Sequence, residues 1–230
     1  MARIDTIKNS LNHWGLLKTL HSGLMRFLCP WLSLCRIHVR PLQATAVEDE
    51  LPDGVSIRRA TRNDLLLAVE EMPNELSLDF INDALDRGDF CAGAFDGPHM
   101  VSFVWRSFST APHLDGLWVA FEKPYRYGYK NYTRPEYRGR HLIKSVREYT
   151  DKLCIERGFT RGIGIVRTDN FASLAAEKKH KGYKGVGFAG YVKVFGKVYP
   201  FRSPGAKKST LQFYRRIDGT DKIIGLPPLP

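Results

Sequence analysis

One junction in this chain constrains the fold most: a strand pattern that turns through a glycine-containing loop into a helix pattern. Residues 125–143 read YRYGYKNYTRPEYRGRHLI. The tyrosine-rich half alternates as a strand does. The second half enters a run with apolar residues at Leu142, Val146, Tyr149 and Leu153, the spacing of one helix face. Because a strand followed by such a helix usually returns as a parallel neighbour, the junction predicts a mixed α/β fold.

The rest of the hydrophobic pattern supplies the other elements of this fold. Upstream, one strand, two helices and two strands are expected, and Thr61 with Asp64 forms a capping-box-like helix start. Downstream, a strand, a helix and two strands follow. We predict a mixed central sheet flanked by helices, in one domain over residues 51–216. Residues 217–230 are assigned to a flexible tail.

Residues 1–50 are assigned to an N-terminal amphipathic helical extension and a linker, outside that domain. Apolar residues recur at helical spacing over residues 4–28, while Lys18 and Arg26 lie mostly on other faces, and a short strand follows. The helix can pack on the domain, pack on a second subunit in a homodimer, or lie on a membrane surface. Because Arg26 and Pro30 interrupt its most apolar run, it should not cross a membrane.

Charge is uneven and indicates an anionic partner for the second half of the chain. The net charge is +11, and residues 122–216 carry 23 basic and 7 acidic side chains. The four cysteines form no C-x-x-C pair, which argues against a zinc site. Free thiols and the lack of a secretory signal pattern favour a cytoplasmic protein, membrane-peripheral if the N-terminal helix binds lipid.

The junction also has the composition of a phosphate-binding site. Gly139 lets the backbone approach a ligand, and Arg134, Arg138 and Arg140 surround the loop with cationic donors. The free amides of a helix start and its dipole attract phosphate. The sequence contains neither a P-loop nor a complete dinucleotide fingerprint.

Two stretches, in the expected order, resemble the GNAT N-acyltransferase (N-acetyltransferase) superfamily. YTRPEYRGRHLIKSVREYTDKLCIERGF resembles the loop and helix with which that family binds the pyrophosphate of coenzyme A. VRTDNFASLAAEKKHKGYKGVG resembles its later strand, Asn-x-x-Ser helix and Gly-Phe/Tyr strand. The resemblance covers about residues 55–200. It implies a GNAT-like fold and an acyltransferase that uses acetyl-CoA or another acyl-CoA, with no metal.

Carried over position by position, the resemblance also implies the cofactor site. Thr133 and Arg134 would offer strand backbone groups to the pantetheine arm, and Asn170 and Ser173 would line the opposite side. The pyrophosphate would be bound by the amides of a continuous run: Arg138, Gly139, Arg140, His141, Leu142 and Ile143.

The sequence departs from the family pattern at two places. His141 and Ile143 stand where the family usually has small residues. We expect His141 in the first helical turn, where φ is negative and glycine is not required. Glu177 stands where relatives often have a tyrosine that protonates the leaving thiolate. Since a thiol pKa lies near 8.5, a strong acid is dispensable, and Ser173, His180 or water could serve.

The tyrosine-rich strand is the candidate acceptor channel, although tyrosines on a sheet often pack in a core. Strict alternation puts one set on one face: Tyr125, Tyr127, Tyr129, Asn131 and Thr133. The other face then carries Arg126, Lys130 and Tyr132. Glu122 or Asp115 could act as the base. The catalytic candidates are Tyr129, Asn131, Ser173 and Glu122.

The leading interpretation is direct attack of a small-molecule or peptide amine on the acyl-CoA thioester, with acetyl as the expected acyl group. One alternative is a non-catalytic GNAT-like module that binds an anionic partner through its basic half, which the missing tyrosine favours. Nucleic acid is an example of such a partner, although a disfavoured one, and KGYKGVGF departs from the RNA-recognition pattern at Lys184. The other alternative is a membrane-associated acyltransferase with a lipid or lipid-linked acceptor.

Overall fold

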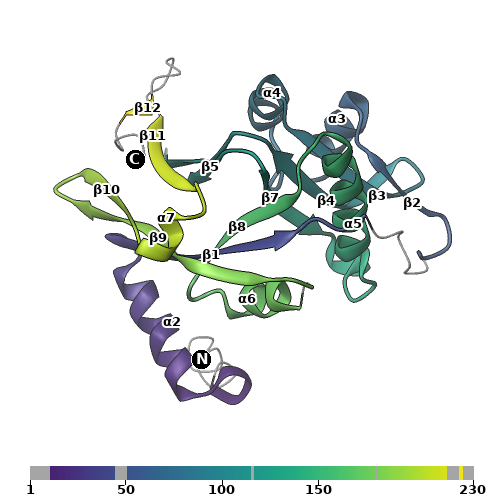
Figure 1. The fold of residues 1–230 in the computed structure, drawn as a ribbon. Coiled ribbons are helices and arrows are strands. Elements are labelled where there is room, and N and C mark those ends of the chain that lie inside the picture. The colour runs from purple at the N-terminus through teal and green to yellow at the C-terminus, as the bar shows by residue number, and fades with distance from the viewer. Residues whose placement is uncertain (1–10, 45–50, 115–116, 180, 217–222, 225–230) are drawn as a thin grey trace.

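The computed structural model describes residues 11–44, 51–114, 117–179, 181–216 and 223–224 (Figure 1). Its centre is an eight-stranded sheet, and a four-stranded sheet lies beside it. Helices cover both faces of the large sheet. The predicted fold class, a mixed central sheet flanked by helices, is confirmed.

In the eight-stranded sheet every neighbouring pair is antiparallel except β7 and β8, which run parallel. The parallel register joins Tyr125 to Arg161 and Tyr127 to Ile163. In sheet order the strands are β10 (Lys197–Arg202), β9 (Lys184–Val194), β1 (Leu32–Pro41), β8 (Arg161–Arg167), β7 (Tyr125–Thr133), β4 (His99–Ser107), β3 (Phe90–Asp96) and β2 (Val55–Arg59).

The smaller sheet packs on the tyrosine side of β7. Phe121 at the end of its strand β6 contacts the ring of Tyr127, with ring centroids 5.6 Å apart, and Val119 and Phe213 join the same buried cluster. The order of its strands is β12 (Ile223–Ile224), β11 (Gln212–Arg216), β6 (Leu117–Ala120) and β5 (Thr110–Leu114).

The large sheet separates two layers of the core, and different helices pack in each layer. Leu65 of α3 and Ile81 of α4 pack in the cluster that holds the tyrosines of β7. Leu142 and Val146 of α5 pack against the opposite face of the sheet. The helical segments are α2 (Leu16–Leu28), α3 (Arg62–Glu71), α4 (Leu78–Asp86), η1 (Pro135–Tyr137), α5 (Leu142–Glu156), α6 (Phe171–Lys178) and α7 (Pro204–Lys207).

Two predicted helix signals are present in the structure. The Thr61 hydroxyl accepts from the amide of Asp64, whose carboxylate accepts from the amide of Thr61, so the capping box at the start of α3 is confirmed. In α5 the predicted apolar spacing also holds, because Leu142 and Val146 are buried.

A bulge in β7 breaks the predicted alternation. Trp105 of β4 faces Tyr129 and Phe103 faces Tyr132, so two residues of β7 lie opposite one of β4. Lys130, inside this bulge, has a φ of 47°. Tyr132 therefore packs on the same side as Tyr129, and assigning it to the opposite face was wrong.

β1 comes from the N-terminal segment yet lies inside the large sheet, between β8 and β9 (Figure 1). Its register with β8 places His38 opposite Gly164 and Arg40 opposite Gly162. A boundary at residue 50 therefore divides one sheet, because residues 32–41 belong to its interior.

Only part of the predicted N-terminal helix falls on described residues. Residues 11–14 and α2 are helical, with a break at Gly15, whose φ is 80°. Residues 4–10 of that prediction lie outside the described residues, as does most of the predicted tail at 217–230. Across the part of the chain that is described, no helix is long and apolar enough to cross a membrane.

Candidate active site

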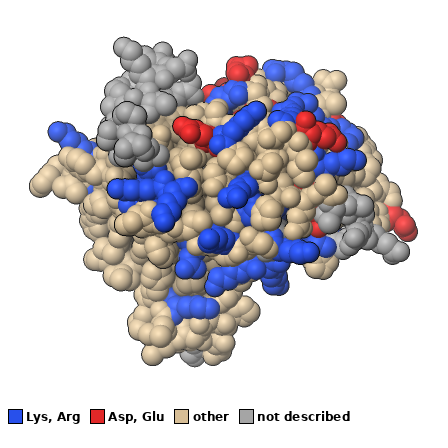
Figure 2. Space-filling model, in the orientation of Figure 1, with Lys and Arg blue, Asp and Glu red and all other residues tan. Residues whose placement is uncertain are grey.

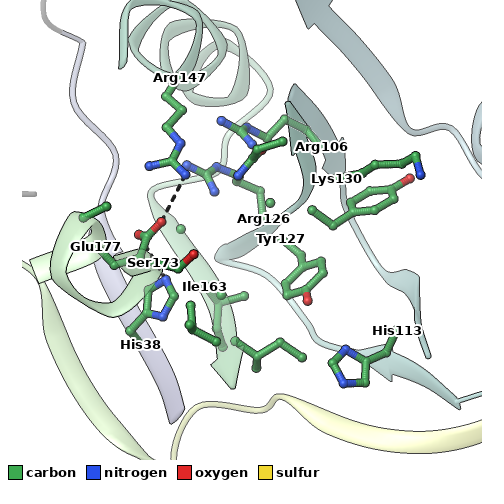
Figure 3. A pocket seen from close by; sticks show the side chains of 18 of the residues that line it. His38, Arg106, His113, Arg126, Tyr127, Lys130, Arg147, Ile163, Ser173 and Glu177 are labelled. Atoms are coloured by element: carbon green, nitrogen blue, oxygen red, sulfur yellow. Dashed lines mark ion pairs between the residues drawn. The ribbon is translucent and has the colours of Figure 1, made fainter. Parts of the chain in front are cut away.

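A cavity of about 630 Å³ opens where β7 and β8 separate (Figure 3). The two strands are paired as far as Tyr127 and Ile163 and diverge beyond these residues. The cavity is lined on one side by α5 and α6, and on the other by residues of β5 and α4. It therefore connects the two faces of the sheet through the gap between the parallel strands.

Glycines form the floor of the cavity on the α5 side. A Cβ on Gly164 would lie 2.6 Å from His38 Nε2, and a Cβ on Gly162 would lie 3.0 Å from Arg126 Cζ. A Cβ on Gly128 would lie 2.9 Å from Arg106 Nη1. The side chains of His38, Arg126 and Arg106 thus lie across these three strand glycines and fill the space that a Cβ would take.

Buried arginines gather on this glycine floor, as Figure 3 shows for Arg106, Arg126 and Arg147. Arg126 Nη2 donates to Asp151 Oδ1 at 2.7 Å, and Arg40 Nη1 donates to Asp151 Oδ2 at 2.5 Å. Burial raises the pKa of Asp151, but the two arginines lower it by more than burial raises it. The resulting pKa is about 2. The Asp151 carboxylate is therefore ionised at neutral pH.

A second carboxylate, Glu177 of α6, connects three elements at the cavity wall. Its Oε1 lies 3.2 Å from Arg147 Nη2, and its Oε2 lies 3.2 Å from His38 Nε2. The His38 ring stacks on Tyr183, with centroids 5.5 Å apart. The position where relatives often have a tyrosine is thus held by a carboxylate, Glu177, which contacts Arg147 and the His38 ring from β1.

The opposite end of the cavity is aromatic. Tyr127 and His113 lie there together in Figure 3. Burial, and then Arg167, lowers the pKa of His113 to about 4, so its imidazole is neutral at pH 7. Tyr129 Oη donates to Asp89 Oδ2 at 2.6 Å. Burial, with Asp89, raises the pKa of Tyr129.

The loop between β7 and α5 has the predicted glycine but not the predicted geometry at His141. Gly139 has a φ of 79°, and His141 precedes the first helical turn with a φ of 57°. The expectation of a negative φ at His141, within the first helical turn, was wrong: His141 is the N-cap before that turn, and its carbonyl accepts from the amides of Lys144 and Ser145. No side-chain hydrogen bond caps this helix start.

Of the predicted site residues, four line the cavity: Tyr129, Asn131, Asn170 and Ser173. Asn170 also caps α6, since its Oδ1 accepts from the amide of Ser173 at 3.1 Å. Glu122 is exposed and does not line the cavity. Asp115 and His180, considered as base and acid, lie outside the described residues.

The remaining predicted residues lie beyond the cavity lining, at the far end of β7 and in the following loop. Thr133 Oγ1 lies 2.8 Å from Ser102 Oγ, and Arg134 forms an ion pair with Glu71. Arg138 and Arg140 are exposed, and the Arg140 guanidinium lies 5.3 Å from the Tyr137 ring. The residues in this group are Thr133, Arg134, Arg138, Gly139, Arg140, His141, Leu142 and Ile143.

Sequence reasoning missed most of the charged cavity lining. His38 and Arg40 were missed because β1 was assigned to an extension outside the domain. A usable signal existed at Gly128, Gly162 and Gly164, because glycine inside a strand marks close approach of another group. The missed residues are His38, Arg40, Arg106, His113, Arg126 and Arg147.

Comparison with known proteins gives matches of fold only. No family model matches the sequence, and comparison with curated proteins gives no match. A Drosophila protein of solved structure has a TM-score of 0.50 at 16% identity, covering 72% of this chain, which spans only 52% of that protein's length. GCN5-related N-acetyltransferases from Kribbella flavida (TM-score 0.46, 14% identity, 83% of this chain and 67% of that one) and Sphaerobacter thermophilus (0.44, 13%, 65% and 48%) are also similar. At 13–16% identity these likenesses concern the fold alone.

Proposed function

We propose that this protein is an acyl-CoA-dependent N-acyltransferase, with acetyl as the simplest acyl group. The observation that carries the proposal is the cavity between the diverging parallel strands β7 and β8, which opens to both faces of the sheet. A thioester lying in this gap would be reached by an amine from the tyrosine side. The cavity volume of about 630 Å³ fits the reacting end of such a donor together with a small acceptor.

The residues present fit the phosphates of coenzyme A at the loop before α5. The helix start has no side-chain cap, and Gly139, which has a left-handed conformation and no side chain, lets the backbone come close to a ligand. Arg138 and Arg140 are exposed beside it and can donate to phosphate oxygens. An anion here would also be stabilised by the positive end of the α5 dipole.

In the proposed reaction the amine nitrogen attacks the thioester carbonyl carbon, the new C–N bond forms, and the C–S bond breaks. The bulge at Lys130 leaves ladder groups unpaired beside the cavity, which suits hydrogen bonding to the carbonyl oxygen as it gains charge. The amine loses one proton to a base, and the thiolate takes up one proton. The neutral His113 imidazole and the Ser173 hydroxyl line the cavity and are the proposed groups for these two transfers.

Calorimetric titration with acetyl-CoA and with acetyl-pantetheine, which lacks the phosphates, tests the proposal. We expect the double variant Arg138→Gln/Arg140→Gln to bind acetyl-CoA about 10- to 100-fold more weakly, because charge-assisted hydrogen bonds to the phosphates are lost. Its affinity for acetyl-pantetheine should be unchanged. Lys152→Gln, which removes an exposed charge elsewhere on α5, is the matched control. If the wild type binds no acyl-CoA of any chain length, the proposal fails and a non-catalytic module becomes the better account.

A further inference from the structure

The arginine cluster under α5 carries more positive charge than its neighbours neutralise. Four buried or nearly buried arginines line the cavity there: Arg40, Arg106, Arg126 and Arg147. The carboxylates that form ion pairs with them are Asp151, which serves both Arg40 and Arg126, and Glu177, which also meets His38. Among the described residues these two carboxylates form ion pairs with three of the four guanidinium groups, and Arg106 is the fourth.

Arg106 carries much of this excess. Its side chain is only 2% exposed, and its hydrogen bonds go to neutral oxygens, Thr150 Oγ1 at 3.0 Å and the Trp105 carbonyl at 3.2 Å. Among the described side chains no carboxylate lies within ion-pair distance of it. Burial lowers the pKa of Arg106, and the neighbouring Arg126 lowers it further.

Arg106 and Arg126 also converge on one point. The Nη1 atoms of both lie within 3.3 Å of the position that a Cβ on Gly128 would take. Arg126 is 4% exposed, and its Nε is buried without a hydrogen-bond partner. Asp151, which is ion-paired to Arg126, offsets part of the repulsion between these two guanidinium groups, and a further anion between them would offset more.

On the basis of the acyl transfer proposed above, we infer that Arg106 and Arg126 bind a further anionic group, a carboxylate or phosphate, carried by the acyl chain or by the acceptor amine. This group is distinct from the phosphates of coenzyme A, because Arg126 lies where β7 and β8 are still paired, opposite Gly162. The loop proposed for those phosphates follows the other end of β7. Paired guanidinium groups suit the two-oxygen geometry of a carboxylate or phosphate.

Calorimetric titrations of the wild type, Arg106→Met and the control Lys152→Gln test this inference. The donor arm compares succinyl-CoA with acetyl-CoA, and the acceptor arm compares phosphoethanolamine with ethanolamine in the presence of coenzyme A. We expect Arg106→Met to lower the affinity for one anionic probe about 10- to 100-fold while changing the affinity for acetyl-CoA less than about threefold. Its melting temperature should equal or exceed that of the wild type, because a buried unpaired charge is removed.

Equal weakening of acetyl-CoA and succinyl-CoA would overturn the inference, since the arginines would then hold the donor's own phosphates. Unchanged affinity for both anionic probes would overturn it as well. Titration with succinate and with inorganic phosphate alone tests the anion site even if no acyl-CoA binds. A failure of this inference can therefore be distinguished from a failure of the proposed function. Should Arg106→Met not fold, Arg106→Lys keeps the charge but not the paired donors, and the same comparisons apply.

A second inference rests on a different surface, the outer face of α2. Large apolar side chains there are exposed by more than half: Leu16 63%, Leu17 83%, Leu20 60%, Leu24 55%, Phe27 70% and, after the helix, Trp31 53%. Most of them share one stripe of the helix, at intervals of three or four residues. Together they form the α2 apolar face.

The other side of α2 is the one that packs on the protein. Met25 is buried, His21 Nε2 lies 3.1 Å from Thr168 Oγ1, and Lys18 lies over the ring of Phe171. The helix is thereby fixed with its apolar face outward. Monomeric soluble proteins rarely expose so many contiguous apolar side chains, and such patches mark interaction sites.

We propose that the α2 apolar face binds an anionic lipid bilayer surface. A second copy of the chain is the weaker candidate, because each copy carries a net charge of +11 and the copies repel. The same charge attracts anionic lipid, and Arg26 lies on the helix itself. Figure 2 shows the surface over α2 as largely uncharged, with basic side chains gathered above it.

Flotation with vesicles of phosphatidylcholine and phosphatidylserine, against phosphatidylcholine alone, tests this surface. We expect the wild type to float with the anionic vesicles and Leu17→Gln/Leu20→Gln/Leu24→Gln to lose most of that binding at an unchanged melting temperature. Leu66→Gln/Leu78→Gln replaces exposed leucines of α3 and α4 and should float like the wild type. Binding retained by the triple variant, or dimers in sedimentation without flotation, would contradict the proposal.

Discussion

The two faces of the sheet around β7 are built on opposite principles. On one face, Tyr127 and Tyr129 pack with Trp105 and Phe80 in a cluster of rings, and the polar atom of Tyr129 is bonded to a buried carboxylate. On the other, Arg126 and its neighbouring arginines lie over bare glycine backbone around a cavity. The first arrangement stabilises the fold, whereas the second gathers like charges around a cavity, at some expense of stability. Substitutions on each face measure this difference.

The largest loss of stability is expected on the aromatic face. Trp105→Ala removes a fully buried indole that contacts the rings of Phe80 and Tyr129, and should lower the free energy of unfolding by about 4 kcal/mol. Urea denaturation measures it. Trp31→Ala, at a side chain that is 53% exposed, should cost less than about 1 kcal/mol. Equal losses would mean that the ring cluster is not what stabilises this face.

On the arginine face, Asp151→Asn should cost about 3 kcal/mol of unfolding free energy. The substitution keeps the shape but leaves Arg40 and Arg126 buried without their shared carboxylate. Denaturant titration compares it with Asp53→Asn, an exposed carboxyl expected to change stability by about 0.5 kcal/mol or less. If the two variants lose the same amount, the Asp151 ion pairs add nothing to stability.

Acid should remove the same contribution without a mutation. The folded pKa of Asp151, about 2, lies below its unfolded value of about 3.9, so its charge stabilises the fold above pH 5. As pH falls from about 5 to below 2, about 2 kcal/mol of stability attributable to this group should disappear. Denaturant midpoints across that range should fall more steeply for the wild type than for Asp151→Asn. Parallel curves would show that another carboxyl dominates.

A smaller effect tests the glycine floor. Gly164→Ala puts a Cβ 2.6 Å from His38 Nε2, so the imidazole must move away from Glu177, and we expect a loss of about 1 to 3 kcal/mol. Gly185→Ala is the control, because its nearest neighbour would lie at 3.7 Å, an ordinary contact. Thermal melts of the two variants measure the difference in stability. If Gly164→Ala leaves the stability unchanged, the His38 ring can move without cost.

The smallest effect expected is for Tyr129→Phe, at about 1 kcal/mol. It keeps the ring in the aromatic cluster and removes only the hydroxyl that donates to Asp89, which retains its ion pair with Arg87. Tyr199→Phe, more than half exposed, should be neutral. Unfolding free energies give the comparison. An unchanged stability for Tyr129→Phe would mean that the hydrogen bond to Asp89 adds nothing to the stability of the fold.

Elements whose signals are local could be predicted from the sequence. The cap at Thr61 and the apolar spacing of α5 depend on neighbours within a few residues, and both are present. The bulge at Lys130 could not be predicted, because lysine carries no signal for a positive φ and the partner strand imposes it. The same holds for His38, whose place in the site depends on pairing between strands remote in sequence.

The position of β1 has a consequence for how the chain reaches this structure. β1 is made before both of its neighbours, β8 and β9, which follow only after the loop and helices of the central region. Pairing between such distant segments raises contact order, which slows folding. Until β8 and β9 emerge, β1 has two unpaired edges, the feature that exposes nascent chains to aggregation and chaperone capture. The pairing of β1 with β8 and β9 is also the pairing that brings His38 and Arg40 to the cavity.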